Sequence, residues 1–117
     1  MGVTSKTREK VISRDTGCFR CGRAANNVHH RMARGSGGSK LPHVNAAANL
    51  LLMCGSGTTG CHGWVETNRA VAYEQGLLVR RNGVLLPSDV PVFSLWRNNW
   101  FFLDDFGGCA VTSPPLI

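Results

Sequence analysis

The sequence predicts a small α+β domain that is stabilised by a metal site. Three features predict this class: four cysteines in two spaced pairs, helical periodicity at 63–75, and apolar runs separated by turn residues after Gly76. A chain of 117 residues is enough for one domain, but its core is small enough for a metal to contribute to stability. We therefore expect a single domain over 1–117, with its main part at 8–76, strands at 77–104 and an irregular tail at 105–117.

The first half of this domain alternates short regular segments with glycine-rich loops. A charged segment at 7–15, with Val11 and Ile12 as its large apolar residues, predicts one or two helical turns. The other expected segments are, in order, a tight knuckle at Cys18-Phe-Arg-Cys21-Gly22, a strand at 27–31, a flexible loop at 34–38, an apolar run at 46–53 and a second loop at 55–60.

The helix expected at 63–75 is the best defined element. Glycine at position 76 is placed to end it. The apolar side chains spaced for one helical face are Trp64, Val65, Val71 and Ala72.

Beyond Gly76 the pattern favours strands. Apolar segments at 77–81 and 84–86 flank Asn82-Gly83, which suits a two-residue type I′ hairpin turn. Segments at 92–96 and 100–103 predict a second hairpin. The aromatic residues of this region complete a small core or support dimerisation or docking, and we favour the core; they are Trp96, Trp100, Phe101 and Phe102.

The positive charge is concentrated in the first third of the chain. Residues 1–40 hold nine Lys or Arg and two acids, whereas the remaining residues hold four basic and five acidic side chains. Because neutralised phosphates supply most non-specific affinity for nucleic acids, this distribution indicates a phosphate-bearing partner. A basic face that serves only solubility is the alternative.

Two features of the sequence indicate where in the cell the protein is expected: its cysteines and the lack of a recognisable targeting segment. The first 25 residues carry no apolar stretch of the kind that a signal peptide needs, and no run approaches the length of a membrane span. We expect a soluble intracellular protein without a membrane partner. Disulfides are disfavoured in a reducing compartment, so the cysteines are better explained as metal ligands.

Cys18-x2-Cys21 and Cys54-x6-Cys61 supply four thiolates, the number that a closed tetrahedral zinc site needs. We expect these four residues to hold a structural Zn²⁺ that clamps the segment carrying the histidines. The alternative is that they are free or buried cysteines with this spacing. Cys109 lies outside both pairs and is expected to be a lone thiol.

The residues around three histidines carry a resemblance to a known family. Val28-His29-His30-Arg31, Asn49-Leu50-Leu51-Leu52-Met53-Cys54 and Cys61-His62-Gly63-Trp64 follow one another in an order that resembles the HNH endonucleases, particularly those encoded by bacteriophages and prophages. The resemblance covers 8–76. It implies a zinc-stabilised ββα-metal domain, also called a His-Me finger, extended here by C-terminal β-hairpins.

The resemblance also implies a role for each matched residue. His30 matches the general base, and Asn49 matches the asparagine whose amide holds the loop carrying that base. His29 and His62 match ligands of a catalytic divalent metal. Arg31, Arg34 and Lys40 are expected to bind nucleic acid, although solvated arginines are the alternative. His43 follows a proline in an expected loop and is predicted to be non-catalytic.

The expected reaction is hydrolysis of a DNA phosphodiester by a water that His30 activates. His29 replaces the family's usual carboxylate, and imidazole ligands favour Mn²⁺, Ni²⁺ or Zn²⁺ over Mg²⁺. The spacing within the second cysteine pair also departs from the tight pair of many members. Two alternatives remain: a non-catalytic zinc-dependent DNA-binding module and an RNA-cleaving HNH nuclease. The resemblance implies a phage terminase as partner. The expected location is the cytoplasm, which would be that of the host cell if the protein is encoded by a phage.

Overall fold

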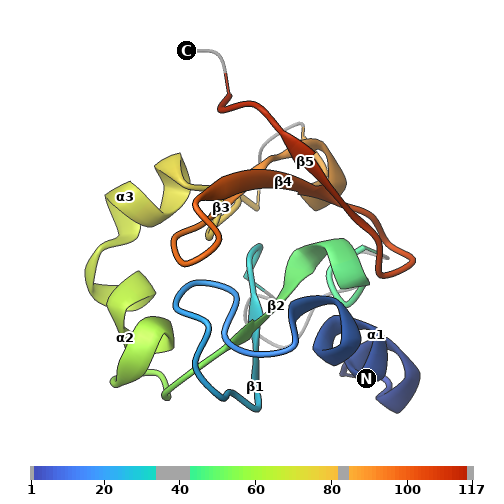
Figure 1. The fold of residues 1–117 in the computed structure, drawn as a ribbon, viewed down its shortest axis with the longest axis horizontal. Coiled ribbons are helices and arrows are strands. Elements are labelled where there is room, and N and C mark those ends of the chain that lie inside the picture. The colour runs from blue at the N-terminus through green and yellow to red at the C-terminus, as the bar shows by residue number, and fades with distance from the viewer. Residues whose placement is uncertain (1, 34–42, 82–84, 116–117) are drawn as a thin grey trace.

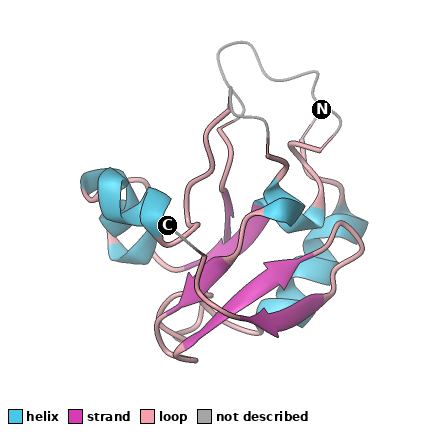
Figure 2. Ribbon diagram, turned by 90° about the horizontal axis from the view of Figure 1, so that it is seen from above, coloured by secondary structure: helices cyan, strands magenta, loops and turns pink. Residues whose placement is uncertain are grey.

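The computed structural model describes residues 2–33, 43–81 and 85–115. Two small antiparallel sheets lie between helices on two sides (Figure 1). Figure 2 shows α2 and α3 on one side of the strands and α1 on the other. None of the helices in these ranges has the length and apolarity needed to cross a lipid bilayer.

The first helix, α1 (Ser5–Asp15), covers the expected segment and begins two residues earlier. Thr4 caps its start, because its hydroxyl accepts a hydrogen bond from the Thr7 N–H at 3.1 Å. At its end the buried Asp15 carboxylate accepts the Leu52 N–H at 2.9 Å. Arg14 pairs with Asp15 at 2.7 Å and donates to the Ala47 carbonyl. These contacts fix the end of α1 against the strand that carries Leu52.

The first sheet pairs β1 (Asn27–His30) with β2 (Leu50–Met53), as expected for the strand at 27–31. All four residues of β2 are buried. A 3-10 turn, η1 (Ala47–Asn49), leads into β2. In this register His29 lies opposite Leu51 and His30 opposite Leu50, so the two neighbouring histidines point to opposite faces of the strand.

The helix expected at 63–75 is two helices, α2 (Gly60–Thr67) and α3 (Arg69–Glu74). The break has a local cause, because polar side chains compete for helical carbonyls. Thr67 donates its hydroxyl hydrogen to the Gly63 carbonyl, and Asn68 donates its amide to the Trp64 carbonyl at 2.9 Å. The single-helix prediction was therefore wrong at Asn68, whereas Gly76 does follow α3 in a left-handed conformation with φ of 74°.

The first expected hairpin is not formed by the described residues on either side of its turn. Neither 77–81 nor 85–86 is a strand, and 82–84 lies outside the described residues. Leu77, Leu78 and Val79 are instead a buried segment without regular secondary structure. The Val79 N–H donates to the Arg31 carbonyl at 2.8 Å, so this backbone is paired to the end of β1.

The second sheet orders β3 (Val92–Ser94), β4 (Asn99–Leu103) and β5 (Cys109–Thr112). The hairpin expected at 92–103 is confirmed. The tail expected to be irregular contains β5, so that prediction was wrong over this segment. Asp104 explains the turn, because its carboxylate accepts the N–H groups of Phe106 and Gly108, both at 2.8 Å. A short η2 (Pro87–Asp89) precedes β3.

A shared core joins the second sheet to the cysteine knuckle. Phe101 of β4 meets Phe19 edge-on, with ring centroids 6.1 Å apart. The Ser94 hydroxyl donates to the Phe19 carbonyl at 2.7 Å. Phe101 is buried, as expected for a core residue, whereas Trp96 and Phe102 remain 49% and 40% exposed.

Candidate active site and metal centre

The four cysteines expected to bind a metal come together in space. The sulfur atoms of Cys18, Cys21, Cys54 and Cys61 all lie within 4.8 Å of one another, an arrangement that can hold a metal ion such as structural zinc. Cys18 and Cys21 come from the knuckle after α1, Cys54 follows β2, and Cys61 lies in the first turn of α2. Cys109 is exposed on β5 and is not part of the cluster.

Electrostatics within the cluster differ from one thiol to the next. Burial raises the pKa of Cys61 to about 12. Burial acts in the same direction on Cys21, but hydrogen bonds from the Arg23 backbone and the neighbouring thiols lower its pKa to about 7. A bound metal cation favours the thiolate form of all four cysteines, because its positive charge offsets the cost of burying negatively charged sulfur atoms.

Arg20 is a contact of this cluster that the sequence analysis missed. Its guanidinium donates to the Cys61 sulfur at 3.4 Å and stacks over the Trp64 ring, with its central carbon 3.8 Å from the ring centroid. It therefore ties the knuckle to α2 on two successive turns of that helix.

The cysteine cluster also positions His62. The His62 N–H donates to the Cys54 carbonyl at 3.0 Å, and the neighbouring Cys61 N–H donates to the Cys54 sulfur at 3.4 Å. Within the described residues the Nδ1 atom of His62 is buried and has no hydrogen-bond partner. A buried ring nitrogen without a partner fits a metal ligand.

His29 lies beside His62. Their ring centroids are 5.2 Å apart, and the rings meet at an interplanar angle of 73°. The His29 Nε2–H donates to the Leu77 carbonyl at 2.8 Å, which leaves the lone pair on Nδ1. Burial, with smaller contributions from His62, His30 and Arg31, lowers the pKa of His29 to about 4. The ring is therefore neutral at pH 7, as a metal ligand must be.

His30 is held by a residue that the sequence analysis did not single out. Its Nε2–H donates to the Asn45 side-chain oxygen at 2.9 Å, a tautomer that leaves the lone pair on Nδ1. Asn45 lies in the connection between β1 and η1, and no sequence pattern marks it.

Asn49 is buried and is not among the residues that line the cleft. Its side-chain oxygen accepts the Met32 N–H at 2.7 Å, and its amide donates to the carbonyls of Met32 and Val44. The Asn49 carbonyl also accepts the Arg31 N–H at 2.8 Å. Asn49 thus fixes the backbone that follows His30, which is the geometry that a positioning role requires.

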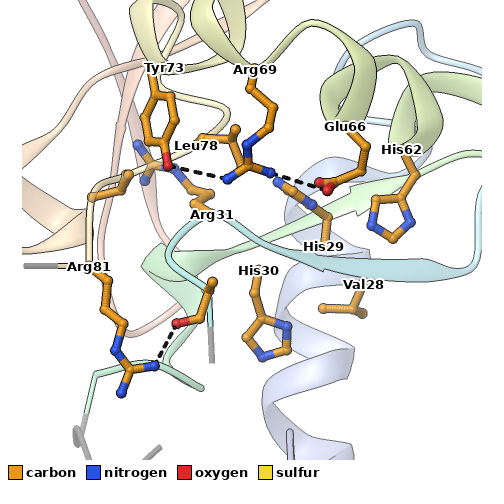
Figure 3. Close-up of a pocket in the computed structure, with 12 residues that line it drawn as sticks. Val28, His29, His30, Arg31, His62, Glu66, Arg69, Tyr73, Leu78 and Arg81 are labelled. Atoms are coloured by element: carbon orange, nitrogen blue, oxygen red, sulfur yellow. Dashed lines mark hydrogen bonds and ion pairs between the residues drawn. The ribbon is translucent and has the colours of Figure 1, made fainter. Parts of the chain in front are cut away.

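His29, His30 and His62 all line one cleft of about 330 Å³. Figure 3 shows the His30 side chain on the opposite side of β1 from those of His29 and His62. The opposite wall carries residues of α2, α3 and the segment after α3. They are Glu66, Arg69, Tyr73, Leu78, Val79 and Arg81. None of them was predicted as a site residue from the sequence, because their polar members lie in the part of the chain without excess positive charge.

The prediction that Arg31 contacts nucleic acid was wrong. This side chain has no exposed surface, and its guanidinium donates to four carbonyl oxygens at 2.7 to 3.0 Å. Those donors are committed to the interior, so Arg31 anchors the fold and does not reach a phosphate. Arg34 and Lys40, as well as the loop expected at 34–38, lie outside the described residues.

The chain was compared with known proteins at three levels. No protein-family model matches it, and no curated protein or solved structure matches it either. The residues of the cleft and of the cysteine cluster therefore carry the indications of function.

Proposed function

We propose that this protein is a metal-dependent DNA endonuclease of the HNH type, with His30 as its general base. The observation that supports the proposal most is that three histidines, two from β1 and one from the start of α2, line one cleft that arginines also line. The strand pair β1 and β2 together with α2 supplies the two strands and the helix that the resemblance implies.

His30 is suited to accept a proton. Imidazole is the side chain that most often serves as a general base in enzymes. The hydrogen bond to Asn45 holds the ring in the tautomer with its lone pair on Nδ1. The Asn49 clamp on Met32 fixes the backbone two residues further on. His30 can therefore take the proton of a water that attacks a phosphodiester in the cleft.

His29 and His62 are the residues that would hold the divalent cation. When bound, such a cation neutralises charge on the phosphate and on the departing oxygen. The two side chains fit this role because His29 is neutral, with its Nε2 committed to Leu77, and His62 has a buried nitrogen without a partner among the described residues. Two imidazole ligands favour Mn²⁺ or Ni²⁺ over Mg²⁺.

The cysteine cluster is assigned a structural role in this proposal, with Zn²⁺ as its metal. Four thiolates complete a tetrahedral shell and leave no open position for a substrate. The hydrogen bond from His62 to the Cys54 carbonyl makes the cluster the anchor of one proposed catalytic ligand.

Plasmid cleavage tests the proposal. The purified protein, freed of loosely bound metal, is resupplied with Mg²⁺, Mn²⁺ or Ni²⁺ and compared with His30→Ala. His43→Ala is the matched control, because His43 does not line the cleft. We expect cleavage that is stronger with Mn²⁺ or Ni²⁺ than with Mg²⁺, falls by about a hundredfold or more in His30→Ala and is unchanged in His43→Ala.

Each other result favours a different function. Binding of DNA without cleavage by a folded, zinc-loaded protein would favour the DNA-binding module. Faster cleavage of an RNA of the same sequence would favour a ribonuclease. Equal or better cleavage with Mg²⁺ at matched concentrations would contradict the assignment of His29 as a ligand.

A further inference from the structure

The positive side chains that face the cleft come from an unexpected part of the chain. Arg69 of α3 and Arg81, which follows the buried segment after α3, both line it. None of the basic residues of α1 does, although α1 lies in the most basic third of the sequence. Since Arg31 is buried, the cleft owes its accessible positive charge in the described residues to the region 69–81.

An aromatic ring organises two of these arginines. The central guanidinium carbons of Arg69 and Arg80 lie 5.8 Å and 4.3 Å from the Tyr73 ring centroid. Arg69 also donates to the Tyr73 hydroxyl at 3.3 Å. We call Arg69, Tyr73, Arg80 and Arg81 the arginine surface. The contacts with Tyr73 hold the guanidinium groups of Arg69 and Arg80 in a defined orientation.

Two contacts place this surface against the proposed chemistry. Arg81 donates to the Ala33 carbonyl at 3.3 Å, three residues beyond His30 (Figure 3). Arg69 pairs with Glu66 at 3.1 Å, and Glu66 lies one helical turn after His62 on α2. Both partners of this pair are about half exposed, so the interaction is weak. A phosphate can replace the carboxylate as the partner of Arg69 at little cost.

We propose that the arginine surface binds the sugar–phosphate backbone of the DNA next to the scissile bond. This inference rests on the proposed function, since it names the residues that hold the substrate of the same cleft. Guanidinium groups suit the role because their paired N–H donors match two phosphate oxygens. Contacts of this kind position the DNA and carry no sequence preference.

Binding measurements as a function of salt test the proposal without any need for turnover. A fluorescently labelled DNA duplex is titrated with His30→Ala protein carrying Arg69→Gln, Arg81→Gln or both. Arg23→Gln is the matched control, because Arg23 is exposed and does not line the cleft. Lys6→Gln combined with Lys10→Gln tests α1 as the competing surface. Circular dichroism and urea titration verify that each variant is folded.

We expect each cleft substitution to weaken binding by about tenfold. Each should also reduce the slope of log K against log salt by about one. The Arg23 and the α1 variants should retain both values. Wild-type affinity and slope in the double cleft variant, or losses confined to the α1 variant, would overturn the inference.

The outcome separates this inference from the nuclease proposal. If DNA binding depends on the arginine surface but the protein does not cleave a plasmid, the proposal for the arginine surface stands and the nuclease proposal is rejected. If cleavage depends on His30 but DNA binding is unchanged in the Arg69 and Arg81 variants, the nuclease proposal stands and the proposal for the arginine surface is rejected.

Discussion

Replacing Arg31 with methionine tests whether the residue beside the proposed base is a structural anchor. Arg31 follows β1 directly, and its guanidinium lies in the interior without a carboxylate partner among the described residues. Methionine retains most of the side-chain volume and removes all five N–H donors. The substitution therefore isolates the hydrogen bonds from the packing.

The expected loss follows from the carbonyls that Arg31 contacts. The Pro87 carbonyl also accepts the Val90 N–H, so it retains a donor. The carbonyls of Ala48, Gly76 and Val90 lose the guanidinium. An unsatisfied buried acceptor costs about 1–3 kcal/mol, so the carbonyls of Ala48 and Gly76, whose bonds are buried, amount to at least about 2 kcal/mol, and the part-buried Val90 carbonyl adds less. Because methionine carries no charge into the interior, the lower end of the range is the expected loss.

Urea unfolding followed by tryptophan fluorescence measures the effect, with both proteins saturated in Zn²⁺. A domain of this size has a total stability of about 5–15 kcal/mol, so the loss should be plain in the midpoint. Arg23→Met, at an exposed position, should change stability by less than about 0.5 kcal/mol. A loss below about 1 kcal/mol for Arg31→Met, with an unchanged slope, would refute the anchoring role.

Two further predictions concern acid stability and metal removal. His29 has its pKa lowered to about 4 from an ordinary 6.5, mainly by burial, so the unfolded chain binds more protons between these values. Stability should be complete above pH 6.5 and fall as the pH drops toward 4, by roughly 2 kcal/mol at pH 5. Urea titrations should find this loss in the wild type and not in His29→Gln, and parallel losses in both would exclude His29 as the cause. Chelation of the metal should lower Tm by more than about 10 °C, and Cys54→Ser should weaken the Co²⁺–thiolate absorption that Cys109→Ser leaves unchanged. An unchanged Tm after verified metal removal would show that the cysteine cluster has no structural role.

Short-range sequence signals sufficed for the elements that depend on neighbouring residues. The helix at 7–15, the strand at 27–31 and the hairpin at 92–103 follow from local periodicity and turn chemistry, and the structure contains all three. Residue type and spacing were also enough to group the four cysteines, since thiols in two spaced pairs have few other uses in a reducing compartment.

Local signals misled where side chains compete with backbone or where strand partners are distant. Apolar spacing favoured a single helix at 63–75, but side-chain hydrogen bonds end α2 near Asn68. Glycine and proline around β5 indicated an irregular tail, yet the free edge of β4 pairs with it. Sequence periodicity describes the faces of an element and cannot report which edge is available to it.

The sequence by itself was enough to group the four cysteines and to single out the three histidines that line the cleft. Only the tertiary structure decided which charges face the cleft. The guanidinium of Arg31 donates hydrogen bonds to carbonyls that lie 17 to 59 positions further along the chain. Arg69 and Arg81, which come from a segment with little net charge, line the cleft instead. The physical reason is that burial of a charge depends on acceptors supplied by distant segments, and no local pattern in the sequence encodes their arrangement.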